Sequence, residues 1–200
     1  MVTIERWQAA QAAERKQHTY SFEEGYEHYK DSYRQYFDFV GIDPAAVKSI
    51  IVEIGPADFP ALMYAHALQG VIIEPMPSTI LRDWVEGHPW CELVTSPAEG
   101  YKIQPLGIRI EVWLFNVLQH VHNPDLIIAN CKNFADTIRF FEPINCGTDE
   151  CHLHNLTIEM FKNWFGVENV NYYPPNPDAK NFHTHECAYG VWSNPHIQLL

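Results

Sequence analysis

The stretch from Lys48 to Pro77 constrains the fold of this chain more than any other. Two short apolar runs, Ile50 to Ile54 and Val71 to Ile73, flank a segment with a helical pattern from about Phe59 to Leu68. A strand, a crossover helix and a second strand in this order predict a parallel βαβ unit. Such units build doubly wound sheets, in which ligands bind beyond the carboxyl ends of the strands.

Residues at those two strand ends indicate the kind of ligand. Gly55 gives the backbone room at the first turn, and the Glu74 carboxylate can accept hydrogen bonds from both hydroxyls of a ribose. A dinucleotide would also need further glycines to cradle its pyrophosphate, but this turn reads GPADFP, with Ala57, Phe59 and Pro60 in their place. S-adenosylmethionine carries adenosine without phosphate and tolerates such a turn.

Three segments resemble motifs of the Rossmann-like (class I) S-adenosylmethionine-dependent methyltransferases. They are VEIGP at the first strand end, VIIEP at the second, and VWLFNVLQHVHNP farther along, and the resemblance spans roughly Ser49 to Trp192. It implies an α/β fold with a doubly wound, mostly parallel seven-stranded sheet, an antiparallel C-terminal edge hairpin and N-terminal helices. We therefore expect a helical cap region over residues 1–44 and a methyltransferase domain over residues 45–200.

The same resemblance implies which residues hold the cofactor S-adenosylmethionine. The first turn would shape the methionine pocket, Glu74 would hold the ribose, Met76 would pack near the adenine, and Asn116 would approach the methionine moiety. Family members often have Asp near Ser96, where this chain offers Ser96 and Glu99. The implied cofactor-binding set is Glu53, Gly55, Pro56, Ala57, Glu74, Pro75, Met76, Ser96, Asn116 and Val117.

The candidate catalytic residues are two histidines beyond a buried central strand. Ile110 to Phe115 reads as that strand, and the loop after it, Asn116 to His122, should face the reacting group at the topological switch point. His120 and His122 can each take up a proton near neutral pH, which suits a general base. Family histidines at this position are also frequently structural, so both roles stay open.

Candidate contacts to the methyl acceptor come from both ends of the chain. Two N-terminal helices are expected, and the second, beginning near Ser21, carries an aromatic stripe that includes Tyr29 and Tyr33. Their hydroxyls are pocket candidates, although such a stripe is more often core packing. The segment HLHNLT resembles methyltransferase loops on the acceptor side of the cleft, which makes His152 and His154 candidates as well.

The remaining chain reads as alternating helices and strands. A helix capped near Ser78 and ended by Gly87 precedes a third strand, Cys91 to Val94. A helix from Asp125 to Phe134, a strand from Thr137 to Pro143 and a helix that begins at Thr157 and ends at Gly166 follow. The final pair, Val170 to Tyr173 and Cys187 to Trp192, is expected to be antiparallel at the sheet edge.

Charge and composition narrow the partners. The chain has a formal net charge of −12 and only 13 Lys and Arg residues, which argues against a nucleic-acid partner and leaves a small or basic acceptor easier to accommodate. The charge also serves solubility. No apolar run approaches the length of a membrane span and the first residues are too polar for a signal peptide, so we expect no membrane partner and a cytoplasmic location.

The expected function is methyl transfer from S-adenosylmethionine to a small-molecule oxygen or nitrogen, with the oligomeric state left open. One alternative is a protein that binds the cofactor without catalysis, because the first turn is poor in glycine. The other is a metal-binding protein, although no HExxH or paired CxxC motif is present and a metal site is not the expectation. Its ligands would come from His120, His122, Cys146, Cys151, His152, His154, His183, His185 and Cys187.

Overall fold

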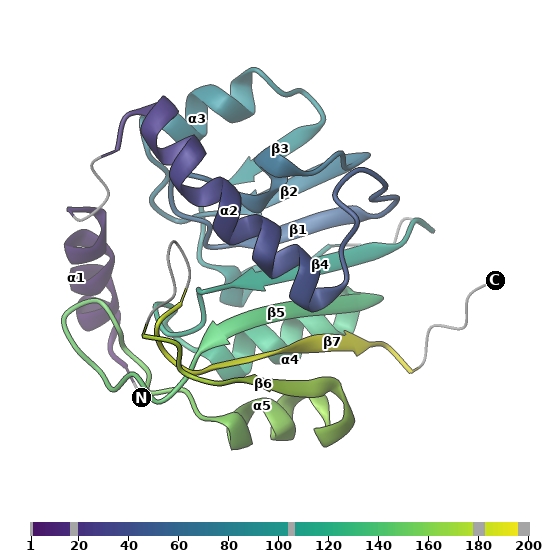
Figure 1. The fold of residues 1–200 in the computed structure, drawn as a ribbon. Coiled ribbons are helices and arrows are strands. Elements are labelled where there is room, and N and C mark those ends of the chain that lie inside the picture. The colour runs from purple at the N-terminus through teal and green to yellow at the C-terminus, as the bar shows by residue number, and fades with distance from the viewer. Residues whose placement is uncertain (1, 17–19, 104–106, 178–182, 196–200) are drawn as a thin grey trace.

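The computed structural model describes residues 2–16, 20–103, 107–177 and 183–195. Within them, seven strands form one sheet in the order β3-β2-β1-β4-β5-β7-β6 (Figure 1). Only β7 is reversed: it pairs antiparallel with both of its neighbours, β5 and β6. The predicted fold class, edge hairpin included, is confirmed. The strands are β1 Ile50–Ile54, β2 Gln69–Ile73, β3 Cys91–Val94, β4 Ile110–Phe115, β5 Thr137–Pro143, β6 Val170–Tyr173 and β7 Cys187–Ser193.

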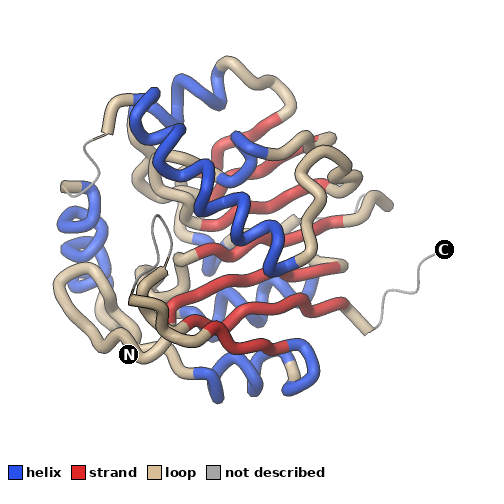
Figure 2. The backbone as a smooth tube through the Cα atoms, in the orientation of Figure 1, coloured by secondary structure: helices blue, strands red, loops and turns tan. Residues whose placement is uncertain are grey.

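Helices cover both faces of the sheet (Figure 2). In Figure 1, α2 crosses in front of the strands, α4 lies behind them, and α1 stands beside their carboxyl ends. In the described residues, no helix combines the length and apolar character needed to cross a membrane. The helices are α1 Ile4–Arg15, α2 Phe22–Val40, α3 Thr79–Glu86, α4 Pro124–Phe134 and α5 Ile158–Phe165.

The helix boundaries follow the capping residues of the sequence. Ser21 begins α2 with a capping box, in which its side chain accepts from the Glu24 N–H and Glu24 reaches back to the Ser21 backbone. The left-handed Gly41 ends that helix. Ser78 and Thr157 cap α3 and α5 in the same way through their hydroxyl oxygens. These predicted helix starts are confirmed.

The crossover between β1 and β2 corrects one expectation. In place of a helix from about Phe59 to Leu68 there is a single 3-10 turn, Ala61–Tyr64. The face of the sheet that a crossover helix would cover is instead packed by α2, whose Gly25 lies so close to the Phe59 ring that an added Cβ would stand 2.1 Å from it. The apolar residues of the segment are therefore buried against α2 without forming a helix of their own.

Two hydrophobic clusters, one on each face, hold the sheet between the helices. Strand residues alternate between them: Val52 and Ile54 of β1 pack toward α4 and α5, whereas Ile51 packs toward α2 with the fully buried Trp113. A strand buried on both faces reads as the continuous apolar run that the sequence shows for β1 and β4. This core fixes the carboxyl ends of β1, β2 and β4, where the loops of the candidate site begin.

Candidate functional site

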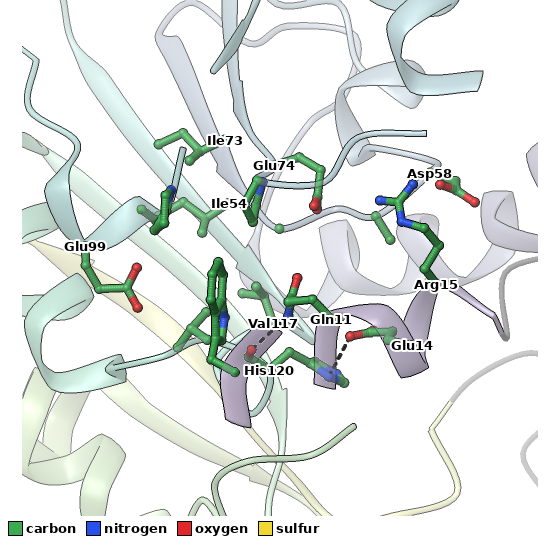
Figure 3. A pocket seen from close by; sticks show the side chains of 17 residues that line it. Gln11, Glu14, Arg15, Ile54, Asp58, Ile73, Glu74, Glu99, Val117 and His120 are labelled. Atoms are coloured by element: carbon green, nitrogen blue, oxygen red, sulfur yellow. Dashed lines mark hydrogen bonds and ion pairs between the residues drawn. The ribbon is translucent and has the colours of Figure 1, made fainter. Parts of the chain in front are cut away.

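A pocket lies at the carboxyl ends of β1, β2 and β4, and α1 closes one side of it (Figure 3). Each wall comes from a different segment, so the pocket exists only in the folded chain. Its lining residues are Trp7, Gln11, Glu14 and Arg15 of α1; Ile54, Gly55, Ala57 and Asp58 around the first turn; Ile73, Glu74 and Pro75 at the end of β2; Pro97, Ala98 and Glu99 after β3; and Val117, His120 and Val121 after β4.

The first turn depends on Gly55 for two reasons. Its φ of 62° lies in the left-handed region, where a side chain is strained, and an added Cβ would stand 2.2 Å from a methyl carbon of Val117. Ala57, two residues on, also has a positive φ, of 54°. The turn therefore brings its backbone close to the loop after β4, and Gly55 leaves the space that separates them.

Two buried glutamates hold the loops of the site in place. The Glu53 carboxylate accepts hydrogen bonds from the N–H groups of Ala61 and Leu62, at 2.6 and 3.0 Å. Glu142, on β5, accepts from the N–H groups of Val117 and Leu118, at 3.0 and 3.1 Å. Burial raises the pKa of each carboxyl to about 8, while the backbone donors act in the opposite direction. Both side chains act on loops and do not line the pocket.

Glu74 lies in the pocket at the tip of β2. Its carboxyl oxygen Oε1 accepts from the Met76 N–H at 3.0 Å, and the residue is only 6% exposed. Burial raises its pKa to about 7, and the nearby charge of Arg15 opposes that shift. A buried carboxylate facing a pocket is costly unless donors reach it. A ligand with two adjacent hydroxyls would supply those donors.

Two adjacent residues of α1 reach opposite sides of the pocket. The Glu14 carboxylate oxygen Oε2 lies 3.0 Å from Nδ1 of His120, in the loop after β4. Arg15 points toward the other side, which carries Asp58 and Glu74 (Figure 3). The Gln11 amide also donates to the His120 carbonyl at 3.1 Å. Helix α1 is thus attached across the pocket by polar groups.

The pocket is acidic. Its described lining carries four carboxyl groups, those of Glu14, Asp58, Glu74 and Glu99, against Arg15 as the sole lysine or arginine. This balance disfavours a pyrophosphate, which would bring two more negative charges into a site of low dielectric. A ligand with a net positive charge and no phosphate fits this lining better.

The structure brings part of the predicted set together. Of the residues expected at the cofactor and the catalytic centre, six line the pocket: Gly55, Ala57, Glu74, Pro75, Val117 and His120. Others lie next to it without lining it. Met76 donates its N–H to Glu74, and the side-chain oxygen of Asn116 accepts from the Gln119 amide at 2.8 Å. Glu53, Pro56, Ser96 and His122 also lie outside the lining.

The expected acceptor contacts have other positions. Tyr33 belongs to the core, where its hydroxyl donates to the Phe59 carbonyl at 2.6 Å. Tyr29 is stacked on the Phe59 ring, with centroids 5.4 Å apart. Nε2 of His154 is 2.9 Å from the Val121 carbonyl, and His152 lies against His120, with ring centroids 4.9 Å apart. Of these four, His152 contacts a pocket residue through its side chain.

The sequence gave no sign of the α1 wall of the pocket. Trp7, Gln11 and Glu14 were recognised as one helical face, but nothing local showed that this face lies over the strand ends. Glu142 was also missed, although a glutamate inside an apolar strand is itself a signal, because buried carboxyls require hydrogen-bond partners. Among the described residues, no group of three or more His, Cys, Asp or Glu side chains is arranged to hold a metal ion.

No protein-family model and no curated protein matches the chain. Solved structures do. The N-methyltransferase NodS from Bradyrhizobium japonicum WM9, in complex with S-adenosyl-L-homocysteine, matches with a TM-score of 0.59 and 13% identity over 82% of this chain and 86% of that one. A chain from the complex of the Haloferax volcanii Trm112 methyltransferase activator with a methyltransferase matches with a TM-score of 0.59 and 11% identity, over 88% and 94%.

A third match limits what this likeness means. The [4+2]-cyclase SpnF has a TM-score of 0.54 and 11% identity, covering 70% of this chain and 57% of that one. At such identities the likeness shows the fold, and one fold supports several reactions. The chain therefore has the Rossmann-like fold of the class I methyltransferases, and its reaction has to be argued from the pocket.

Proposed function

We propose that the chain is an S-adenosylmethionine-dependent methyltransferase that acts on a small-molecule oxygen or nitrogen. The observation that carries this proposal is Glu74, a buried carboxylate at the tip of β2 that faces an acidic, phosphate-excluding pocket. Such a group is suited to accept hydrogen bonds from the two hydroxyls of a ribose. The donor that joins a ribose to a positive charge, without phosphate, is S-adenosylmethionine.

The other pocket residues fit the rest of that donor. Gly55 and Ala57 leave their backbone close to the space beside Val117, which suits a methionine chain. Arg15 and Asp58, of opposite charge, match a carboxylate and an ammonium group. Pro75, Pro97 and Ala98 offer an apolar wall beyond Glu74 that suits an adenine ring. In this assignment α1 covers the donor and supplies one of its charged contacts.

When bound, S-adenosylmethionine supplies a methyl carbon on a positively charged sulfur, and that carbon–sulfur bond breaks as the acceptor's electron pair bonds to the carbon. The protein's part is to orient the two reactants and exclude water. Fixed turns at Gly55 and Val117, held by Glu53 and Glu142, suit that task because they do not need to reorganise. The net charge of −12 supports a small or cationic acceptor over a nucleic acid.

The test is the affinity for S-adenosylhomocysteine in a pair of variants. Glu74→Ala should weaken binding by about 1 to 3 kcal/mol, or roughly 5- to 150-fold, because the ribose hydroxyls would lose their acceptor. Glu92→Ala is the matched control, since Glu92 is exposed on the neighbouring strand and outside the pocket. Equal affinities in the two variants would remove the ribose assignment. Binding without methyl transfer to any acceptor would favour a non-catalytic binding protein.

A further inference from the structure

His120 lies between two acidic groups at the margin of the pocket. Its Nδ1 atom is 3.0 Å from Glu14 Oε2, and the two side chains are 11% and 25% exposed. The approach is close but poorly aligned, since within the described part of the chain this buried nitrogen makes no hydrogen bond of good geometry. Catalytic hydrogen bonds are often misaligned before substrates bind and tighten in the complex. A small rotation of the ring would align this one.

A second histidine–carboxylate pair continues from the first. The His152 ring lies 4.9 Å from the His120 ring, and its own Nδ1 is 2.7 Å from Asp149 Oδ2. Hydrogen bonds from the His152 backbone and ring lower the pKa of Asp149 to about 2, so this carboxylate stays charged. The loop that carries the pair is fixed to the loop after β4, because the Leu153 N–H donates to the Gln119 carbonyl at 2.7 Å.

The position of this assembly suits the acceptor more than the donor. Figure 3 shows the His120 ring close to Glu14 beneath α1, on the opposite side of Val117 from Glu74 and Glu99. Glu74 marks the ribose end of the proposed donor, so the His120 side remains for the second reactant. The His152 side chain is 32% exposed, which gives the assembly an outlet to solvent.

We propose that Glu14 and His120 form a carboxylate–imidazole pair that removes a proton from the methyl acceptor. His120 is the catalytic residue and Glu14, on α1, is the positioning residue that holds its Nδ1–H and leaves Nε2 as the base. The charged and titratable groups that face this ring are Glu14 from α1 and His152, with Asp149 behind it, from the loop before α5. The proposal rests on the methyltransferase function, and it selects acceptors whose oxygen or nitrogen carries a proton.

The proton and the electrons balance without a further reactant. Nε2 of His120 takes the proton from the acceptor atom, whose electron pair then forms the bond to the methyl carbon. The imidazolium that results is stabilised by the Glu14 carboxylate, as a histidine base is by its carboxylate partner in other enzymes. His152 offers that proton a route to water. No oxidant, reductant or metal is required.

A purely structural role for the same contact must be excluded by the test. Helix α1 is also attached by the Gln11 amide, which donates to the His120 carbonyl, and by the Arg6 guanidinium, which donates to the carbonyls of Asp149 and Glu150. If Glu14 only fastens α1, loosening the helix at Arg6 should have the same effect as removing Glu14. Arg6→Ala is therefore the anchor control, and Glu5→Ala, on the exposed face of α1, is the control for losing a helical glutamate.

The first readout is ¹⁵N NMR of the histidine rings at pH 8 in the complex with S-adenosylhomocysteine. We expect His120 to carry its proton on Nδ1 in the wild type, Glu5→Ala and Arg6→Ala, and to become a mixture of tautomers in Glu14→Ala. The same mixture in the wild type, or no change in Glu14→Ala, would overturn the proposal. Loss of binding of S-adenosylhomocysteine by the wild type would instead refute the proposed function itself.

The second readout is methyl transfer from labelled S-adenosylmethionine to phenol, catechol, benzylamine and tyramine. For any of these that is methylated, Glu14→Ala should lower kcat on the order of tenfold to a hundredfold, the size expected for disturbing a general base, with KM for the donor unchanged. Arg6→Ala should lower kcat less than about threefold. Equal losses of kcat in the two variants would show that Glu14 acts as an anchor for α1. If none is methylated, the NMR result alone decides.

Discussion

Replacing Gly55 with alanine should destabilise the fold and distort the site at the same time. The substitution places a side chain where φ is 62°, which costs a non-glycine residue about 1 to 2 kcal/mol. It also places a Cβ 2.2 Å from Val117 Cγ2, in a core that cannot yield freely, and overpacking of this kind costs about 1 to 3 kcal/mol. Together these effects predict a loss of about 2 to 5 kcal/mol in the free energy of unfolding.

The two contributions can be separated by a double-mutant cycle. Val117→Ala removes the methyl group that the new Cβ would strike, but it leaves the strained φ unchanged. The double variant should therefore be more stable than the sum of the single effects predicts, by about 1 to 3 kcal/mol. Gly100→Ala is the control, because an added Cβ there has nothing within 4 Å and its φ is not positive.

Urea denaturation followed by circular dichroism gives the required free energies of unfolding. Because Val117 is also a pocket residue, affinity for S-adenosylhomocysteine should fall in Gly55→Ala more than in Gly100→Ala. Strict additivity in the cycle would refute the close approach of the first turn to the loop after β4. A loss below about 1 kcal/mol in Gly55→Ala would refute the left-handed conformation as well.

Three further variants test other parts of the structure. Burial raises the pKa of Glu142 from 4.5 to about 8, so the folded chain binds the proton more tightly than the unfolded chain, and this contribution to stability is lost as the pH rises from about 5 to 8. Glu142→Gln should flatten the dependence of the unfolding free energy on pH in that window, whereas a slope equal to that of the wild type would contradict the assignment. Glu53→Gln should flatten it in the same way, since the pKa of Glu53 is also raised to about 8, and an unchanged melting profile between pH 5 and 8 would argue against it. Ser78→Ala should cost about 1 kcal/mol through loss of the α3 cap, measurable by thermal denaturation, with Ser96→Ala expected to be neutral because Ser96 is exposed outside any helix.

Local signals sufficed for most of the fold. The strands β1, β4 and β5 are continuous apolar runs with clear ends, and α2, α3 and α5 begin at Ser or Thr caps, so their bounds follow from short stretches of sequence. The 3-10 turn between β1 and β2 was not predictable in this way. Its apolar pattern is helical, but the space on the sheet is taken by α2, a partner distant in sequence.

The site divides along the same line. Glu74 and Gly55 could be assigned because each ends a recognisable strand, and parallel strands bring their carboxyl ends to one edge. Glu14, Arg15 and Trp7 could not, because their place depends on how α1 packs across the strand ends through Gln11, Glu14 and Arg6. His152 shows both outcomes: the sequence selected the residue, but its contact with His120 follows from tertiary structure.

Calorimetric titration with S-adenosylhomocysteine, with NAD measured in parallel, tests the central claim most directly. Both compounds carry adenosine, and only NAD carries a pyrophosphate, which the acidic lining should repel. We expect one S-adenosylhomocysteine per chain at micromolar affinity and no binding of NAD. Binding of NAD with equal or higher affinity, or binding of neither compound, would contradict the account of this pocket as a methyl-donor site.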